Sequence, residues 1–499
     1  MIFDATGKVL AQARKSYSTL RPAPYYEEQD PALVRRKVYE AIAGCLDQPG
    51  AKPATVRALG FSSQMYGVFP LDGMDHPLAN SMLWSDGRAE LQGEWLEDQP
   101  GAAELYRTTG CPASGIFPIA KITWLREQRP DLFLSARRFA SIKEYVTLPL
   151  VGEWVVDYSM ASSTGMFDIR SHGWHGQALA WAGIGGDRLS RPASGLEPFA
   201  LLEDSPLAGL GLEPGIPVFL GAGDGPLANL GSGASAVGAV NIDLGTSGAA
   251  RCVTDAATTD DTASLWCFCL TDDLWTCGGI VTNVGNAYEW LGSSLLAPTL
   301  PAGEAYALMN RLAETAAPGA DGLHFLPFLR KVRSPYWDRR LKGTIYGLTA
   351  DHGPKHIARA LLEAIAFDLR AILCIMGRRV RTLPCIVLTG GLAKSAIVPR
   401  ILADVLGREI AVPEESEGSI AGAALMALQG IGAVQSFAFS PGWLRANRIP
   451  PDAAAQSVYD EYYLRHARLV KALREFDPGE GPLNPSRRVG VGPGSGAQP

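Results

Sequence analysis

Two short apolar runs, each ending in a glycine turn, lie close together near the middle of the chain. Residues 217–220 run into GAGDG, and residues 240–244 run into GTSG. A strand that ends at glycines lets backbone N–H groups approach a phosphate closely, and a carboxylate beside such a turn can act as a base. Taken singly, either turn fits an ordinary loop of an alanine- and glycine-rich protein. Together they indicate phosphoryl transfer, which needs both parts.

The length and the charge of the chain narrow the class of protein. At 499 residues it exceeds the size at which single cores stop growing, so two or more domains and a cleft between them are expected. The net charge is −6 and the basic residues are scattered, which argues against a nucleic-acid surface and a membrane anchor. A small-molecule substrate fits this composition better.

The cysteines and the apolar runs bear on location. The eight cysteines include no CxxC pair, so they indicate neither a disulfide framework nor a zinc site. No uninterrupted apolar run reaches the roughly 18 residues of a membrane span, and the first residues lack the apolar core of a signal peptide. We therefore expect reduced thiols in a soluble, cytoplasmic protein.

Periodicity and turn residues predict strands and helices that alternate in the order typical of sheets covered by helices. The chain should open with a hairpin that turns at residues 5–7. The further elements that we expect are helices at 30–45, 356–376, 395–406 and 420–429, the last capped by Ser419, and strands at 56–63, 275–281 and 385–389. From residue 477 onward the chain is rich in Gly, Pro and Ser, which predicts a disordered tail.

A set of polar residues follows the strand at 56–63. Gln64, Asp86 and Arg88 offer an amide, a carboxylate and a guanidinium, which suit a polyhydroxylated acid. Arg88 alone fits equally well as one half of a surface ion pair.

The order of motifs resembles the FGGY family of carbohydrate kinases up to about residue 428, and the gluconokinase-like branch in particular. Each motif is weak alone, and eight in the family's order and spacing are strong. They are SSQMYG at 62–67, WSDGRA at 84–89, SIKEY at 141–145, VVDYSMASSTGMF at 155–167, GAGDGPLANLGSG at 221–233, GTSGAAR at 245–251, LTGGLAKS at 388–395 with ILADVLG at 401–407, and EGSIAGAALMAL at 417–428.

The resemblance implies an α/β fold of two domains, of the actin, hexokinase and heat-shock ATPase type (ribonuclease H-like), with an interdomain cleft. The sugar-binding domain would span residues 1–233 and the nucleotide-binding domain 234–430, followed by a helical extension at 431–476 and the tail at 477–499. Closure of the cleft would exclude water from the γ-phosphate. The implied ligands are ATP with Mg²⁺, which would be held through the ATP phosphates, and a sugar or sugar acid.

The resemblance also implies roles for individual residues. Asp224 matches the catalytic base, which would accept a proton from the sugar hydroxyl as it attacks the γ-phosphoryl group. The sugar-facing positions are Gln64, Met65, Tyr66, Asp86 and Arg88; Lys143 and Arg88 are candidate partners of a substrate carboxylate. The nucleotide positions are Gly245, Thr246 and Ser247 in the phosphate turn and Gly390, Gly391 and Ser395 in the adenosine segment.

Three departures from the family pattern bear on activity. The family's first strand, with an Asp-x-Gly-Thr phosphate turn, is expected to be absent because Met1 falls inside the second strand; a start codon further upstream or a degenerate copy would explain this. At residues 330–335 the family's glutamate is missing, and Tyr66 stands where many relatives have histidine.

Three functions therefore stay open. The first is an ATP-dependent kinase of D-gluconate, and the second is a pentulose kinase such as a xylulokinase. The third, from another class, is a catalytically impaired sugar-binding homologue. A heat-shock-type ATPase is disfavoured because nothing resembles a peptide-binding domain. The sequence does not indicate an oligomeric state, and a homodimer is one that we allow for.

Overall fold

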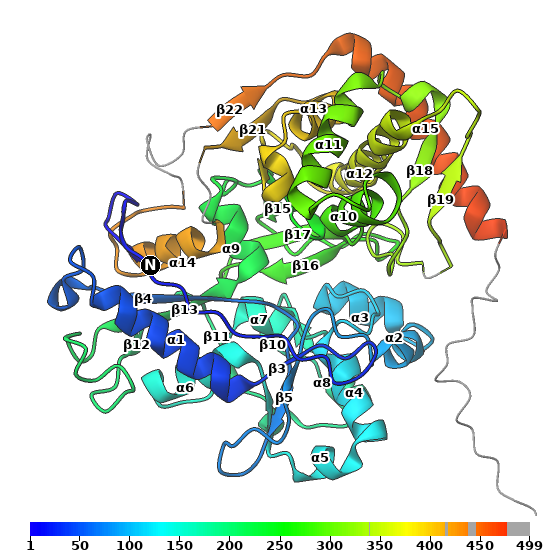
Figure 1. Cartoon of the computed structure of the whole chain (residues 1–499). Coiled ribbons are helices and arrows are strands. Elements are labelled where there is room, and N and C mark those ends of the chain that lie inside the picture. Colours follow the sequence, from blue (N-terminus) through cyan, green and yellow to red (C-terminus); the bar gives the residue numbers. More distant parts are fainter. Residues whose placement is uncertain (339, 415–417, 438–445, 477–499) are drawn as a thin grey trace, which may run out of the picture.

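Two α/β domains lie against each other in the computed structural model of the chain, which describes residues 1–338, 340–414, 418–437 and 446–476 (Figure 1). The first contains strands β1 (Ile2–Phe3), β2 (Val9–Ala11), β3 (Glu28–Gln29), β4 (Leu59–Ser63), β5 (Phe69–Leu71), β6 (Ser81–Met82), β7 (Arg138–Ala140), β8 (Val155–Asp157), β9 (Phe167–Asp168), β10 (Gly173–Trp174), β11 (Arg191–Ala193), β12 (Phe199–Ala200) and β13 (Pro217–Gly223). Its helices are α1 (Pro31–Leu46), α2 (Glu90–Glu97), α3 (Ala102–Thr109), α4 (Pro118–Gln128), α5 (Pro130–Ser135), α6 (Ile142–Val151), α7 (Tyr158–Ser162), α8 (Gly176–Ala182) and α9 (Asp224–Gly231).

The predicted opening of the first domain is confirmed. β1 and β2 form the antiparallel hairpin, and α1 begins after Asp30, whose carboxylate accepts hydrogen bonds from Ala32 N and Leu33 N. The central sheet has the order β12-β13-β4. β13 and β4 are parallel, with Gly223 opposite Ser63, so both strands end at the same edge of the sheet.

The second domain is built on one seven-stranded sheet. Its strands are β14 (Val240–Leu244), β15 (Gly248–Thr254), β16 (Trp266–Cys269), β17 (Trp275–Val281), β20 (Ile386–Thr389), β21 (Ile410–Pro413) and β22 (Ala446–Ile449), in the order β16-β17-β15-β14-β20-β21-β22; a separate hairpin is formed by β18 (His324–Leu326) and β19 (Thr344–Tyr346). Its helices are α10 (Gly285–Leu291), α11 (Ala302–Thr315), α12 (Pro354–Gly377), α13 (Val398–Leu406) and α15 (Ala453–Phe476). β14 and β20 are parallel neighbours, so their glycine turns also meet at one edge.

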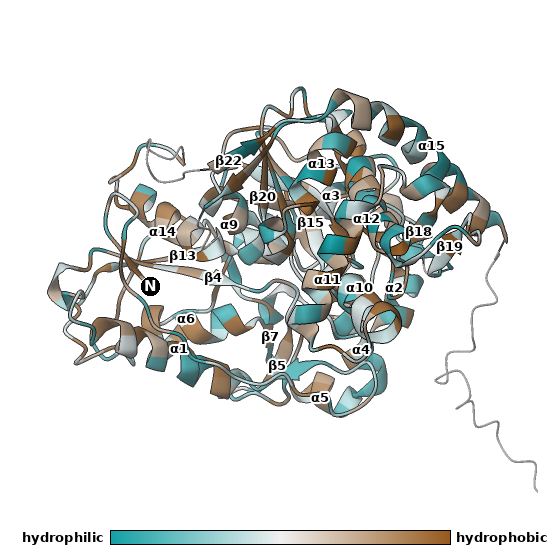
Figure 2. Ribbon diagram, turned by 45° about the horizontal axis from the view of Figure 1, so that its top comes forward, coloured by the Kyte–Doolittle hydropathy of each residue, from teal (hydrophilic) through white to brown (hydrophobic). Residues whose placement is uncertain are grey.

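The core follows the apolar periodicity of the sequence. The predicted helix at 356–376 is α12, most of whose apolar residues are buried, and β17 spans the residues predicted for it. Figure 2 shows apolar residues gathered in the central strands and polar ones along the outer side of α15. None of the helices among the described residues is both long and apolar enough to cross a membrane.

Two helix starts differ from expectation. α13 begins at Val398 rather than at Ser395, and a 3₁₀ turn at Gly391–Lys394 precedes it. The reason is Pro399, which lacks an N–H group and fits only the first turn of a helix. Ser419 lies within α14 (Gly418–Gly430) and not before it, so it does not cap that helix from outside.

The chain returns to the first domain near its end. α14 packs across α9, β4 and β13, although it follows the strands of the second domain in sequence (Figure 1). The crossing with α9 is very close, because a Cβ at Gly422 would lie 2.1 Å from Leu227 O. After α14, β22 pairs with β21 and α15 packs on α12 and α13. The tail predicted at 477–499 lies outside the described residues.

Candidate active site

Asp224 begins α9 directly after β13. Its Oδ1 accepts a hydrogen bond from Gly225 N at 2.8 Å. The end of β13 is held from the side, because Gly223 N donates to Ser159 Oγ at 3.1 Å and Lys143 Nζ donates to Ala222 O at 2.8 Å. The backbone that carries the Asp224 carboxylate is therefore fixed, while the residue itself is exposed to solvent.

The pKa of Asp224 is raised from its ordinary value. The main cause is desolvation by the protein atoms that surround the carboxylate, even though the residue keeps solvent-accessible surface. Asp243 also raises this pKa, whereas Arg251, Lys143 and the hydrogen bond from Gly225 lower it. A carboxylate in this setting is a better proton acceptor than a fully solvated aspartate.

The parallel pairing of β4 with β13 places the sugar-facing segment beside Asp224. Met65 is buried under the end of β13, since a Cβ at Gly223 would lie 2.6 Å from Met65 Cγ. Tyr66 has a φ of 68°, and its ring contacts Phe117 of the first domain and Phe268 of the second edge-on. Burial and the negative charge of Asp224 raise the pKa of the Tyr66 hydroxyl, so this group stays a hydrogen-bond donor.

Gln64 is half-buried in the same segment and already has a partner. Its Nε2 donates to Gln29 Oε1 at 2.7 Å, which joins the end of β4 to the β3 region. One donor and the carbonyl oxygen of Gln64 thus remain for a ligand.

Asp86 and Arg88 form a closed ion-pair network. Arg88 donates to Asp86 through Nε at 2.9 Å and Nη2 at 2.6 Å, and Nη2 also donates to Glu28 at 2.6 Å. The Arg88 guanidinium lies 3.6 Å from the ring centroid of Tyr26, and its side chain is 7% exposed. The charge of Arg88 is therefore matched by two carboxylates within the first domain.

Lys143 is buried rather than open to the cleft. Its Nζ donates to Asp157 Oδ2 at 2.7 Å as well as to Ala222 O, and its side chain is 3% exposed. Two of its donors are thus used inside the first domain, and a contact of Lys143 with a substrate carboxylate stays a prediction. Its contacts place it as a residue that positions the strand end before Asp224.

The phosphate turn and the adenosine segment meet at the ends of β14 and β20. Asp243 pairs with Thr389 in the sheet, and a Cβ at Gly390 would lie 2.5 Å from Leu244 O. Thr246 is exposed, and the turn at Gly245 is closed by a hydrogen bond from Gly245 N to Ser247 O at 2.9 Å. Parallel strands that end in glycine turns at one edge are a usual place for a nucleotide.

The remaining nucleotide positions differ in exposure. Gly391 is exposed, with no atom near the position of its missing Cβ. Ser395 is 7% exposed and its Oγ accepts from Ile397 N at 3.4 Å. Gly391 is thus open to a ligand, while Ser395 lies under the turn.

Arg251 of β15 connects the two halves of the site. Its Nε donates to Gly225 O at 3.2 Å, beside the predicted base, and its Nη2 lies 3.9 Å from Asp243 Oδ2, beside the phosphate turn. Asn229 of α9 in turn donates to Arg251 O at 3.0 Å. The motif GTSGAAR contained this arginine, but its sequence position did not reveal that it reaches across the cleft.

Asp243 offers an oxygen ligand that fits a nucleotide-bound Mg²⁺. Its side chain is 43% exposed beside the phosphate turn. Mg²⁺ keeps several waters and is held by one or two carboxylates together with substrate phosphates, so one such group is enough. Within the described part of the chain, no group of three or more His, Cys, Asp and Glu side chains is arranged to hold a metal alone.

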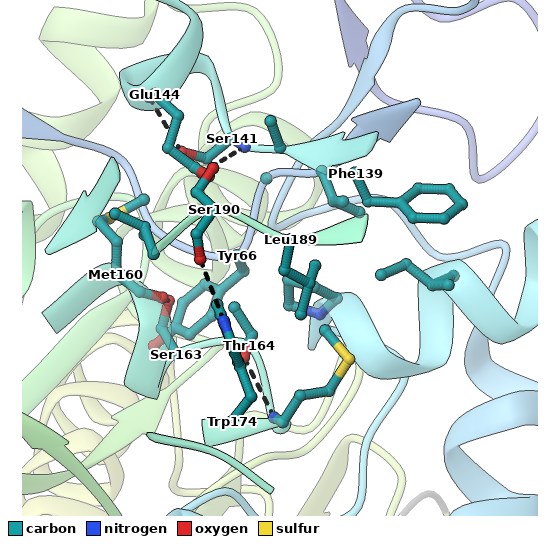
Figure 3. Close-up of a pocket in the computed structure, with 17 residues that line it drawn as sticks. Tyr66, Phe139, Ser141, Glu144, Met160, Ser163, Thr164, Trp174, Leu189 and Ser190 are labelled. Atoms are coloured by element: carbon teal, nitrogen blue, oxygen red, sulfur yellow. Dashed lines mark hydrogen bonds between the residues drawn. The ribbon is translucent and has the colours of Figure 1, made fainter. Parts of the chain in front are cut away.

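A small cavity lies behind Tyr66, inside the first domain. Figure 3 shows Glu144, Ser190, Met160 and Trp174 around it. Its volume of about 30 Å³ has room for about one water molecule and none for a sugar. Asp224 does not line it. This cavity is therefore too small to be the sugar site.

Comparison with known proteins identifies the chain's relatives. The sequence model of the N-terminal domain of the FGGY family of carbohydrate kinases matches residues 1–231, and that of the C-terminal domain matches residues 240–430. A gluconokinase of Bacillus subtilis (strain 168) is 32% identical over 486 residues, which cover 95% of this chain and 90% of that one.

Two solved structures from Lactobacillus acidophilus share the architecture. A ligand-bound xylulose kinase superposes with a TM-score of 0.89 at 27% identity, over 95% of this chain and 96% of that one. A gluconate kinase superposes with a TM-score of 0.87 at 27% identity, over 93% of each chain. The predicted two-domain fold is confirmed.

Proposed function

Because the chain belongs to the FGGY family of carbohydrate kinases and is therefore a phosphotransferase of sugars, we propose that it transfers the γ-phosphate of ATP to D-gluconate. The relation that carries the choice of gluconate is the 32% identity to a gluconokinase over nearly the whole chain. ATP is the phosphate donor that kinases of this family use, and Mg²⁺ is part of the proposal.

In the proposed reaction, a gluconate hydroxyl oxygen attacks the γ-phosphorus while the bond from that phosphorus to the β–γ bridging oxygen breaks. Asp224 accepts the hydroxyl proton as the new bond forms, and ADP leaves. The position that supports this role is the start of α9, at the edge where β4 also ends. Mg²⁺ would supply positive charge to the phosphate oxygens, and Asp243 is the residue that would help to hold it.

The phosphates of ATP would lie on Gly245, Thr246 and Ser247, with the adenosine over Gly390 and Gly391. The parallel pairing of β14 with β20 supports this arrangement because it brings both turns to one edge. Arg251 would keep the phosphate turn in register with Asp224 through its contacts with Gly225 and Asp243. In-line transfer depends on such positioning.

A pentulose such as D-xylulose is the second candidate substrate. The close superposition on a xylulose kinase favours it, since the two folds agree over 95% of this chain. Gluconate and xylulose differ in charge, and this difference gives the test its contrast.

The test is an assay of ADP release with ATP, Mg²⁺ and a panel of aldonates and ketoses. We expect the highest kcat/KM with D-gluconate. If the protein phosphorylates D-xylulose but not D-gluconate, gluconate is rejected as the substrate. Asp224→Asn should lower kcat by about 10²- to 10⁴-fold with unchanged ADP binding, because the variant loses the base and keeps the shape. Asp204→Asn, at an exposed aspartate of the same domain, is the matched control. Binding of gluconate without ATP turnover by the wild-type protein would favour the impaired homologue.

A further inference from the structure

A buried arginine of the second domain faces the sugar-facing segment with an unused donor. Arg333 is 9% exposed, and its Nη2 makes one long hydrogen bond to Trp84 O at 3.5 Å. Its Nη1 is buried and has no hydrogen-bond partner among the described residues. A buried guanidinium with so few acceptors is costly unless a ligand completes it.

The segment around Arg333 connects the two domains. Asn283, next to the start of α10, accepts a hydrogen bond from Arg330 N at 2.9 Å and so anchors the segment in the second domain. On the opposite side, Lys331 Nζ pairs with Glu90 of the first domain at 2.6 Å. The segment of Arg333 is therefore held between the two domains, and Glu90 of the first domain already has a cation.

The other cations beside the sugar-facing segment already have ion-pair or hydrogen-bond partners. Arg88 is matched by Asp86 and Glu28. Lys143 is paired with Asp157. Lys121 donates to Tyr66 O at 2.8 Å and to Leu83 O at 2.6 Å, which ties the two halves of the segment together. Of these four basic side chains, Arg333 is the one with a buried donor that lacks an acceptor.

We propose that Arg333 recognises the carboxylate of the substrate and so selects a sugar acid over a neutral sugar. The inference rests on the proposed function and names the residue that would give it specificity. Arg333 lies over the face of Trp84, 5.9 Å from the ring centroid, on the first-domain side of the cleft.

The position of Arg333 favours the substrate over ATP as its anion. Its hydrogen bond to Trp84 O and its place over the Trp84 ring put it beside the sugar-facing segment, whereas the phosphate turn lies at the ends of β14 and β20. The parallel N–H groups of a guanidinium match a carboxylate in geometry as well as in charge. The substrate is thus the anion that we expect to complete the site.

The test compares D-gluconate with D-glucitol, which carries a neutral CH₂OH group in place of the carboxylate. Arg333→Met should raise the KM for gluconate by about 10- to 100-fold, the loss expected for a charge-assisted hydrogen bond. The inhibition constant of glucitol, the KM for ATP and the melting temperature should change little. Arg333→Lys keeps the charge and should recover part of the affinity for gluconate. Arg330→Met removes an exposed cation from the same segment and should behave as the wild type.

Five results would overturn the inference. An equal loss of affinity for gluconate and glucitol would mean that Arg333 has a structural role and does not recognise the charge of the substrate. A raised KM for ATP with an unchanged KM for gluconate would assign the cation to the nucleotide. The same loss in Arg330→Met would mean a general effect of charge. Wild-type protein that phosphorylates no aldonate would reject the proposed function together with this inference, whereas good gluconate turnover that Arg333→Met and Arg333→Lys leave intact would reject the inference alone.

Discussion

Gly390 couples the two nucleotide-binding turns, and replacing it with alanine should disturb both. Gly390 has φ 93° and ψ 178°, a conformation open essentially to glycine alone, in which another residue costs about 1 to 3 kcal/mol. The added Cβ would lie 2.5 Å from Leu244 O, and real Cβ atoms stay at least 3.0 Å from such atoms. Either Gly390 or Leu244 must therefore shift by at least about 0.5 Å.

This shift reaches the site of phosphate binding because Leu244 directly precedes Gly245. A misplacement of 1 Å near the reacting groups can cost about 10²-fold in rate, so we expect kcat/KM for ATP to fall about tenfold in Gly390→Ala. The midpoint of urea unfolding should fall as well, by the equivalent of about 2 kcal/mol. Steady-state kinetics at varied ATP and urea unfolding followed by tryptophan fluorescence measure the two effects.

Gly391→Ala is the matched control. Its Cβ would meet no atom within 4 Å, and its φ lies outside the left-handed range, so the unfolding midpoint should equal that of the wild type. Its KM for ATP can rise, because the new methyl group faces the proposed adenosine. If Gly390→Ala unfolds at the wild-type urea concentration and keeps the wild-type kcat/KM for ATP, the reasoning from the close approach of the two turns is refuted.

Three further predictions concern titratable side chains. The acid limb of kcat/KM should lie above 3.8, the ordinary pKa of an aspartate, because the pKa of Asp224 is raised and activity needs its ionised form; a limb at or below 3.8 would contradict this. Lys143→Met should lower the unfolding free energy by about 3 to 5 kcal/mol, since it leaves Asp157 buried without its cation; a higher KM for gluconate at unchanged stability would instead make Lys143 a substrate contact. Burial lowers the pKa of His324 to about 4 from 6.5, so the unfolded chain binds its proton first and stability falls as the pH drops from 6.5 to 4. The unfolding free energy of His324→Phe, measured with urea, should fall between pH 6.5 and 4 by up to about 3 kcal/mol less than that of the wild type. An unchanged pH dependence would refute the assignment of this loss to His324.

The sequence predicted the elements that carry the site because each signal was local. The apolar run before GAGDG became β13, the run before GTSG became β14, and the long amphipathic stretch became α12. What the glycine turns did not reveal was which strands are neighbours. The parallel pairs, β4 with β13 and β14 with β20, arise from packing across more than 140 residues in each case, and no local pattern records them.

The partners of charged side chains were the least predictable feature. Lys143 and Arg88 were both candidate partners of a substrate carboxylate, and Arg88 also fitted an ion pair; carboxylates elsewhere in the first domain neutralise both. The segment of Arg333 lacks the family's glutamate but keeps an arginine before Ser334 and Pro335. The unused donor of this arginine was visible only once the fold placed it against Trp84. A basic side chain can bind a substrate carboxylate only when no carboxylate of the protein already pairs with it. Such pairing depends on three-dimensional packing.

The return of α14 to the first domain has a consequence for how the chain folds during synthesis. α14 covers β4 and β13, and it buries Leu227 and Leu230 of α9 together with its own Leu425 and Met426. A segment that follows the strands of the second sheet thus covers part of the first domain, and a nascent chain that ends before residue 418 would leave those leucines without their cover. The native packing of the first domain must wait until nearly the whole second domain has left the ribosome. We therefore expect that a fragment ending at residue 231 aggregates when made alone, and that adding residues 232–437 in a separate chain restores solubility.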